Sequence, residues 1–234
     1  MTAPENGTRL AEGIYDYTLD DRSFAKEIWR ITRLDDAQTH LQTILSTEGQ
    51  IRFGIDLLLD AGGLPTDMEA RVNTPEGEVR GHYVFSAGGV QGQIARPGAA
   101  ATPVQLALPA NTLPLPESIA MRWLIGQAIN LADENEQALT ICLIPIAEEG
   151  GTPLEPRLVA ARATVLGQET VELLMADVGA TRVLLEWPGM PPQHAWFDAR
   201  RFPVQWAWVG HAGAAGAGMS HTMSLTRYAW HEAV

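Results

Sequence analysis

The fold of this chain is decided by residues Val165–Trp208, which read VLGQETVELLMADVGATRVLLEWPGMPPQHAWFDARRFPVQWAW. Apolar, β-branched and aromatic runs alternate in this stretch with short Gly and Pro signals, which is typical of consecutive antiparallel strands. Its last part carries His194, Trp196 and Asp198 ahead of Trp206. We therefore predict a meandering sheet with one aromatic-rich face.

Similar β-rich runs recur on the N-terminal side of this stretch, roughly every ten to fifteen residues, with turn signals between them. The pattern predicts an all-β, antiparallel fold built as a curved sheet or open β-barrel. We assign residues 1–11 to a polar arm and residues 12–234 to a single β-rich domain. This domain would contain two possible halves, 12–110 and 139–234, joined by a helix.

One segment of the chain predicts a long helix, at about residues 117–133. It reads ESIAMRWLIGQAINLAD, with prolines just before it and an acidic residue in its first turn, both of which favour a helix start. Its apolar residues cover most of its circumference, which predicts burial on more than one side. Gly126 lies in its interior at a cost of about 1 kcal/mol relative to alanine, so we expect a close approach to the backbone there.

Composition limits the classes of function. The chain has 234 residues, 46% of them hydrophobic, and a net charge of −12. This charge argues against nucleic acid as a partner, because phosphates are neutralised by basic residues. The sequence shows no apolar run long enough for an integral membrane segment. Its N-terminus lacks the pattern of a signal peptide, so we expect a cytoplasmic protein, or one of the cell envelope if a leader has been removed.

The sequence contains no spacing that is diagnostic of chemistry. Its six histidines form neither a His-x₃-His nor a HExxH pattern, so we expect no metal site, and we expect no cofactor. Cys142 is the one cysteine, lies in an apolar run and is expected to be an inert core residue. Paired carboxylates fall in turns. We therefore name no catalytic residue.

The seven tryptophans are the strongest indication of a binding site. Ligand pockets are mostly apolar and aromatic with a few polar groups. If the sheet is curved and not fully closed by the helix, we expect a ligand site made by Trp123, His194, Trp196, Asp198 and Trp206. The alternative is that the tryptophans are core residues and that Asp198 caps a turn.

The region around Val165–Trp206 also resembles a known family. It carries Gly167-Gln168-Glu169 after a strand, then Trp196-Phe197-Asp198, and then Pro203-Val204. This order resembles an uncharacterised bacterial family of antiparallel β proteins whose architecture is similar to the Lol lipoprotein carriers. The resemblance implies a curved, incompletely closed sheet whose hydrophobic concave side is covered by helix. The family usually carries an export leader, which this sequence does not show.

Three hypotheses of function follow. The first is a non-enzymatic carrier that binds a hydrophobic small molecule or lipid-like chain between sheet and helix. The second is a lipocalin-like enzyme in which His194 or Asp198 acts as acid or base in an aromatic cavity. The third is an assembly protein, in which an exposed sheet edge pairs with a partner or with a second copy in a homo-oligomer.

Overall fold

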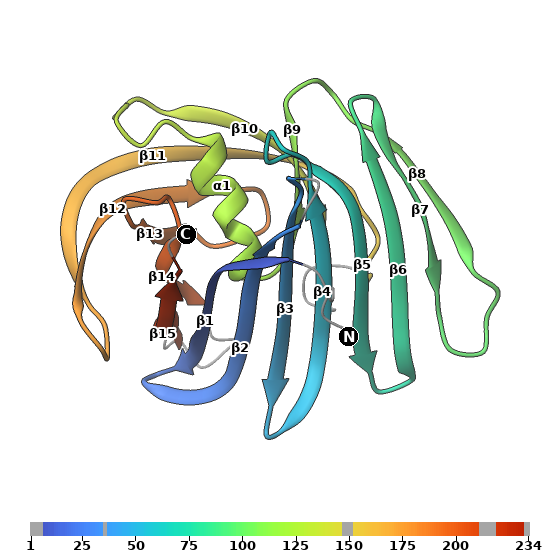
Figure 1. Cartoon of the computed structure of the whole chain (residues 1–234), viewed down its shortest axis with the longest axis horizontal. Coiled ribbons are helices and arrows are strands. Elements are labelled where there is room, and N and C mark those ends of the chain that lie inside the picture. Colours follow the sequence, from blue (N-terminus) through green and yellow to red (C-terminus); the bar gives the residue numbers. More distant parts are fainter. Residues whose placement is uncertain (1–6, 35–36, 147–151, 211–218, 232–234) are drawn as a thin grey trace.

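The strands of this protein form one open sheet (Figure 1). The structure, a computed structural model, describes residues 7–34, 37–146, 152–210 and 219–231. Its 15 strands follow the order β8-β7-β6-β5-β4-β3-β2-β1-β15-β14-β13-β12-β11-β10-β9. All neighbours are antiparallel except β9 and β10. Within the described residues β8 and β9 do not pair, so the sheet does not close. The predicted fold class is confirmed.

The N-terminal half of the sheet is a simple antiparallel meander. It consists of β1 (Thr8–Leu19), β2 (Arg22–Arg33), β3 (Thr39–Thr47), β4 (Gln50–Leu59), β5 (Pro65–Thr74), β6 (Gly77–Ser86), β7 (Gly89–Ala95) and β8 (Thr102–Ala107). The first strand begins at Thr8 and so includes part of the segment assigned to a polar arm. Residues 1–6 of that arm lie outside the described part of the chain.

The C-terminal half is a second antiparallel meander from β10 onward, with β9 added as a parallel edge strand. It consists of β9 (Thr112–Pro116), β10 (Gln137–Ile144), β11 (Arg157–Glu172), β12 (Asp177–Glu186), β13 (Gln193–Phe197), β14 (Pro203–Gly210) and β15 (Met219–Trp230). Strands β11 to β14 are the meander that the stretch Val165–Trp208 predicts. The halves join where β1 pairs with β15, with Ala11 opposite Trp230.

Each strand turns alternate residues toward the inside of the curve, because side chains on a strand alternate between its two faces. In β1 and β2 these inward positions hold Tyr15, Glu27 and Trp29, none more than 1% exposed. The sheet curls around the short helix α1, which lies in its hollow (Figure 1). The core therefore fills the space between the inner face and this helix.

The helix is much shorter than predicted. Of the predicted segment 117–133, only η1 (Ala120–Arg122), a turn of 3₁₀-helix, and α1 (Trp123–Ala128) are helical. Leu124 and Ile125 are buried, as the apolar pattern predicts. The prediction of a long helix is wrong, and that of a buried one is confirmed. Among the described residues, no helix has the length and hydropathy needed to cross a bilayer.

Pairing at both ends explains the short helix. Before it, Glu117 donates its backbone N–H to the carbonyl of Ile144 at 3.0 Å, which continues the pairing of β9 with β10. After it, Ile129 is extended, with φ −93° and ψ 150°. The Arg201 guanidinium binds the carbonyl of Ile129 at 3.2 Å and so satisfies a carbonyl at the end of the helix. The apolar pattern of the segment does not reveal either partner.

Gly126 lies where the β13–β14 turn packs against α1. A Cβ atom at this position would lie 2.2 Å from the carbonyl oxygen of Arg201 and 2.8 Å from the ring of Phe197. Only glycine fits such a contact without moving the turn or the helix. The predicted close approach to the backbone at Gly126 is confirmed.

Candidate functional site

A cavity on the inner side opens at one end of the curved sheet. Its volume is about 1120 Å³, and we call it the rim cavity. Its wall is mostly apolar and includes Phe24, Leu45, Phe53, Val72, Met190 and Met223. On the helix side the wall is formed by Glu117, Ser118, Ile119 and Arg122. The cavity therefore joins an apolar wall to a few polar groups beside the helix.

Glu27 fixes the start of the helix against the sheet. Its carboxyl oxygens accept hydrogen bonds from the Tyr17 hydroxyl, the Thr43 hydroxyl at 2.6 Å, the Ser118 hydroxyl at 2.8 Å, and the backbone N–H groups of Ile119 at 3.2 Å and Ala120 at 3.3 Å. The first N–H groups of a helix have no acceptor within the helix, so the Glu27 side chain from β2 acts as their acceptor. Burial, and then the charge of Glu27, raises the pKa of Tyr17 well above its usual range, so the hydroxyl stays a donor.

Glu27 has a sequence signal that a search for catalytic and binding motifs misses. In β2 the inward positions are Ala25, Glu27, Trp29 and Ile31. Glu27 is acidic and the other three are apolar. A carboxyl group at such a position needs hydrogen-bond partners, because an isolated buried charge is very costly. An acidic residue on the apolar face of a strand is thus a sign of a buried network.

Arg122 is a buried charged residue in the cavity wall, and it is 5% exposed. Its guanidinium carbon lies 4.2 Å from the ring centre of Trp206 and 6.0 Å from that of Trp187. The group donates to Oε1 of Gln193 at 3.2 Å, and Trp206 donates to the same oxygen at 2.7 Å. Burial lowers the pKa of Arg122, an effect that the charge of Glu117 opposes. The arginine still carries its charge at neutral pH.

Two of the predicted site residues lie on the outer face of the sheet. His194 and Trp196 contact each other there, with ring centres 6.1 Å apart. Arg182 donates to Nδ1 of His194 at 3.3 Å and stacks over Trp196 at 5.3 Å, while the Trp196 indole donates to Glu169. Burial, and then the charge of Arg182, lowers the pKa of His194. Neither residue lines the rim cavity.

The other three predicted residues lie on the inner side but apart from the cavity wall. Trp206 is fully buried beneath Arg122, and Trp123 is half-buried on α1. Asp198 accepts the backbone N–H groups of Arg200 at 2.9 Å and Phe202 at 2.8 Å and so caps the β13–β14 turn. The structure thus divides the five predicted residues between two faces and does not bring them together in one pocket. Their role in binding stays a prediction.

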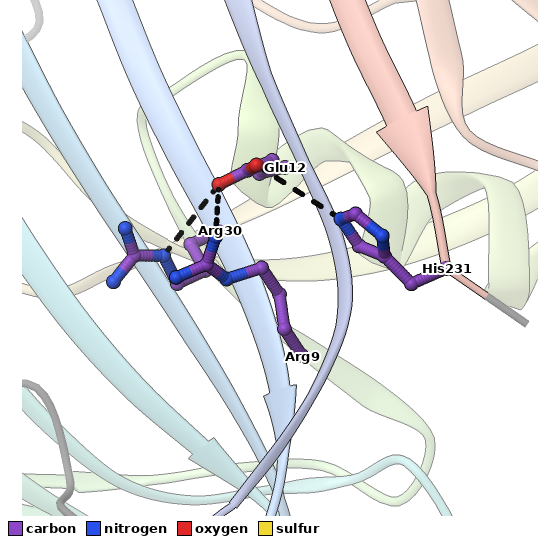
Figure 2. Close-up of polar contacts among 4 residues, drawn as sticks. All are labelled: Arg9, Glu12, Arg30 and His231. Atoms are coloured by element: carbon purple, nitrogen blue, oxygen red, sulfur yellow. Dashed lines mark ion pairs between the residues drawn. The ribbon is translucent and has the colours of Figure 1, made fainter. Parts of the chain in front are cut away.

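The outer face carries exposed ion pairs. Around the β1–β15 junction, Glu12 binds Arg9 at 3.1 Å, and Arg30 and His231 at 3.9 Å each (Figure 2). These side chains are between about a third and a half exposed. Exposed pairs of this kind contribute little stability, so we interpret this cluster as ordinary surface charge.

A groove of about 860 Å³ on the outer face crosses β3 to β7. His40 lies 3.0 Å from Asp56, which also accepts from Gln42 at 2.6 Å, and His82 lies 2.9 Å from Asp67. Each histidine thus places one ring nitrogen on a carboxylate, while Nδ1 of His40 is buried without a hydrogen-bond partner among the described residues. Within the described residues, no three His, Cys, Asp or Glu side chains are placed to hold a metal ion.

Cys142 is buried in the core, and burial raises the pKa of its thiol to about 12. The thiolate, which is the reactive form, is therefore scarce at neutral pH. This agrees with the expectation of an inert core cysteine.

Comparison with known proteins identifies the fold and no activity. No protein-family model matches the chain, and no curated protein matches it. A crystal structure of a β-barrel-like protein from Brucella abortus, of the domain of unknown function DUF1849, is similar over 96% of this chain and 99% of that one, with a TM-score of 0.57 and 16% identity. A crystal structure of a DUF1089 family protein from Pseudomonas aeruginosa is similar over 93% of this chain and 95% of that one, with a TM-score of 0.46 and 14% identity. At such identities the first similarity shows the fold alone, and the chain shares a large open antiparallel sheet with a protein of unknown function.

Proposed function

We propose that this protein is a non-enzymatic carrier that binds a hydrophobic small molecule or lipid-like chain in the rim cavity. The observation that carries the proposal is an apolar cavity of about 1120 Å³ at the open end of the sheet. Sites for small molecules commonly measure about 300–1000 Å³ and are mostly apolar with a few placed polar groups. The rim cavity is slightly larger than this range and has this kind of wall.

The position of the short helix also supports the proposal. Because Glu27 binds the helix start and Arg201 binds its end, the helix is held at both ends and leaves the cavity beside it unfilled. A long helix along the hollow would occupy more of this space. The same arrangement, a curved open sheet with helix on its concave side, is what the resemblance to the Lol-type carriers implies, and we propose a carrier role on this basis.

The two alternative functions have less support. An enzyme that uses His194 or Asp198 requires one of them in a cavity, and neither lines the rim cavity. Assembly through a sheet edge would use β8 or β9. Strand β9 contains Pro114 and Pro116, which lack the N–H group that pairing needs. Strand β8 contains one proline, Pro103, and so is the less interrupted edge on which an assembly proposal would rest.

Occupancy of the purified protein tests the carrier role. Native mass spectrometry should show a mass above that of the bare chain, and solvent extraction should release the apolar compound. A stripped sample should then bind an apolar fluorescent probe. A sample with the bare mass that also fails to bind the probe after stripping would overturn the proposal.

Two matched substitutions localise the binding. Val72 faces the rim cavity, whereas Val84 on the neighbouring strand is 50% exposed on the outer face. Val72→Phe should weaken probe binding because the larger ring fills part of the cavity, and Val84→Phe should leave it unchanged. Equal affinities in both variants would mean that the probe binds elsewhere. Thermal denaturation of both variants checks that they remain folded.

A further inference from the structure

We propose that the ligand of the rim cavity ends in an anionic oxygen head group, a carboxylate or a phosphate, and that Arg122 binds this group. The proposal rests on the proposed function and names the chemical class of its ligand. It follows from the place of Arg122, a charged residue that is buried and yet lines an apolar cavity. A cation in such a place recognises an oxyanion with little competition from water.

The guanidinium is held in a fixed orientation. It stacks on Trp206 and donates to Gln193, so its plane and direction are set before a ligand arrives. An arginine has five N–H donors, of which the bond to Oε1 of Gln193 uses one, and the charges of Glu117 and Glu27 also act on the group. Arginine also matches carboxylate and phosphate geometry, because two parallel N–H groups can bind two oxygens.

Gln193 orients the guanidinium from behind the cavity wall. Its Oε1 accepts from Arg122 and Trp206, both of which are donors, so the amide oxygen must face them. Its Nε2 group is buried and has no hydrogen-bond partner among the described residues, in a side chain that is 1% exposed. A buried donor without a partner is costly, and an ordered water would satisfy it. Because Gln193 does not line the rim cavity, it acts on the ligand only by orienting Arg122.

The charge of the cavity wall differs from that of the whole chain. The net charge of the chain is −12, with 28 acidic and 16 basic residues. The described residues of the wall include two arginines, Arg52 and Arg122, and one acidic residue, Glu117. Glu27, whose charge also acts on Arg122, lies behind this wall, so the charges around the guanidinium balance instead of being acidic as in the whole chain. An anionic ligand is therefore disfavoured less here than elsewhere on the molecule, since neighbouring charges determine the local potential.

Head-group preference of the wild-type chain is the first test. Four probes share a twelve-carbon chain and end in a carboxylate, a phosphate, an alcohol or a trimethylammonium group. Displacement of an apolar dye should rank both anions above the alcohol by roughly 10- to 100-fold in Kd, because charge-assisted hydrogen bonds exceed neutral ones. The ammonium should bind most weakly. An alcohol that equals the anions would overturn the head-group proposal and leave the carrier role standing, whereas no binding by any probe would overturn both.

Substitution of Arg122 is the second test. Arg122→Met should weaken the anionic probes roughly 10- to 100-fold and leave the alcohol unchanged, while Arg122→Lys should restore part of the loss. Arg201→Met is the matched control, because Arg201 also binds the helix but does not line the cavity. It should alter stability and keep the preference for anions. If Arg122→Met weakens alcohol and anion binding equally, Arg122 has a structural role and does not bind the head group. Near-ultraviolet circular dichroism checks that each variant is folded.

Discussion

Glu27 and Glu12 lie on neighbouring strands and have opposite surroundings. Glu27 faces inward, is fully buried and accepts five hydrogen bonds that join the sheet to the helix. Glu12 faces outward and makes three ion pairs with half-exposed side chains (Figure 2). Both carboxyl groups have several partners, but the surroundings differ. Because water replaces lost partners only at the surface, we expect the inner glutamate to control the fold and the site, and the outer one to control neither.

The largest effect is expected from Glu27→Ala. The change leaves three hydroxyl groups and two backbone N–H groups without their acceptor in the core, and it opens a cavity. We expect a loss of about 3 kcal/mol or more in the free energy of unfolding. Urea denaturation followed by tryptophan fluorescence measures it. Because the helix start would be released, binding at the rim cavity should fall as well.

A conservative variant sharpens the same comparison. Glu27→Gln keeps the size of the side chain but turns one acceptor into a donor, which conflicts with the donors around it. The free energy of unfolding of Glu27→Gln should lie between those of the wild type and Glu27→Ala. A loss below about 1 kcal/mol in Glu27→Ala, less than one buried unsatisfied group costs, would contradict the view that this network holds the helix on the sheet.

Gly126→Ala should have the next largest effect. Helix propensity alone predicts a gain of about 1 kcal/mol. The added Cβ would meet the backbone oxygen of Arg201 at 2.2 Å, so the turn or the helix must move, at a cost of about 1–3 kcal/mol. We expect net destabilisation in thermal denaturation. Ala128→Gly, at an exposed position of the same helix, should cost about 1 kcal/mol by propensity, and a stabilised Gly126→Ala would show that the contact is loose.

The contrast between strands and helix explains how far the sequence could predict this molecule. Period-two alternation and turn residues are local signals, so they predicted the strands of Val165–Trp208 and the all-β class. The ends of the helix depend on Ile144 and Arg201, which lie far along the chain, and the apolar pattern of residues 117–133 contains neither partner. Local patterns therefore predicted a long helix where long-range hydrogen bonds make a short one.

The candidate site was harder to predict for the same reason. The aromatic residues at 194, 196 and 206 alternate along and across strands, so alternation shows which residues share a face but not which face lines a cavity. Glu27 and Arg122 lie far apart in the sequence and come near each other only through the fold. The acidic residue on the inner face of β2 was the one local sign of this network.

The pH dependence of Asp56 tests the outer face. Burial would raise the pKa of this carboxyl, but hydrogen bonds from His40 and Gln42 outweigh it and hold the pKa below its usual value. A lowered folded-state pKa adds stability above the unfolded-state pKa, near 4, and this stability is lost as the pH falls through the folded value. Asp56→Asn should therefore cost about 1 kcal/mol at pH 7 and progressively less below about pH 4. Urea titrations from neutral to acidic pH measure the difference, and a difference independent of pH would contradict this account.

Glu12→Gln should have the smallest effect, and it closes the comparison with Glu27. The substitution removes the charge that faces Arg9, Arg30 and His231, but water reaches all four side chains. We expect a change of about 0–0.5 kcal/mol in the free energy of unfolding, smaller still at high salt, because exposed pairs are screened. Urea denaturation at low and high salt measures it, and binding at the rim cavity should stay the same. A loss comparable to that of Glu27→Ala would mean that the β1–β15 junction, rather than the inner network, limits the stability of the sheet.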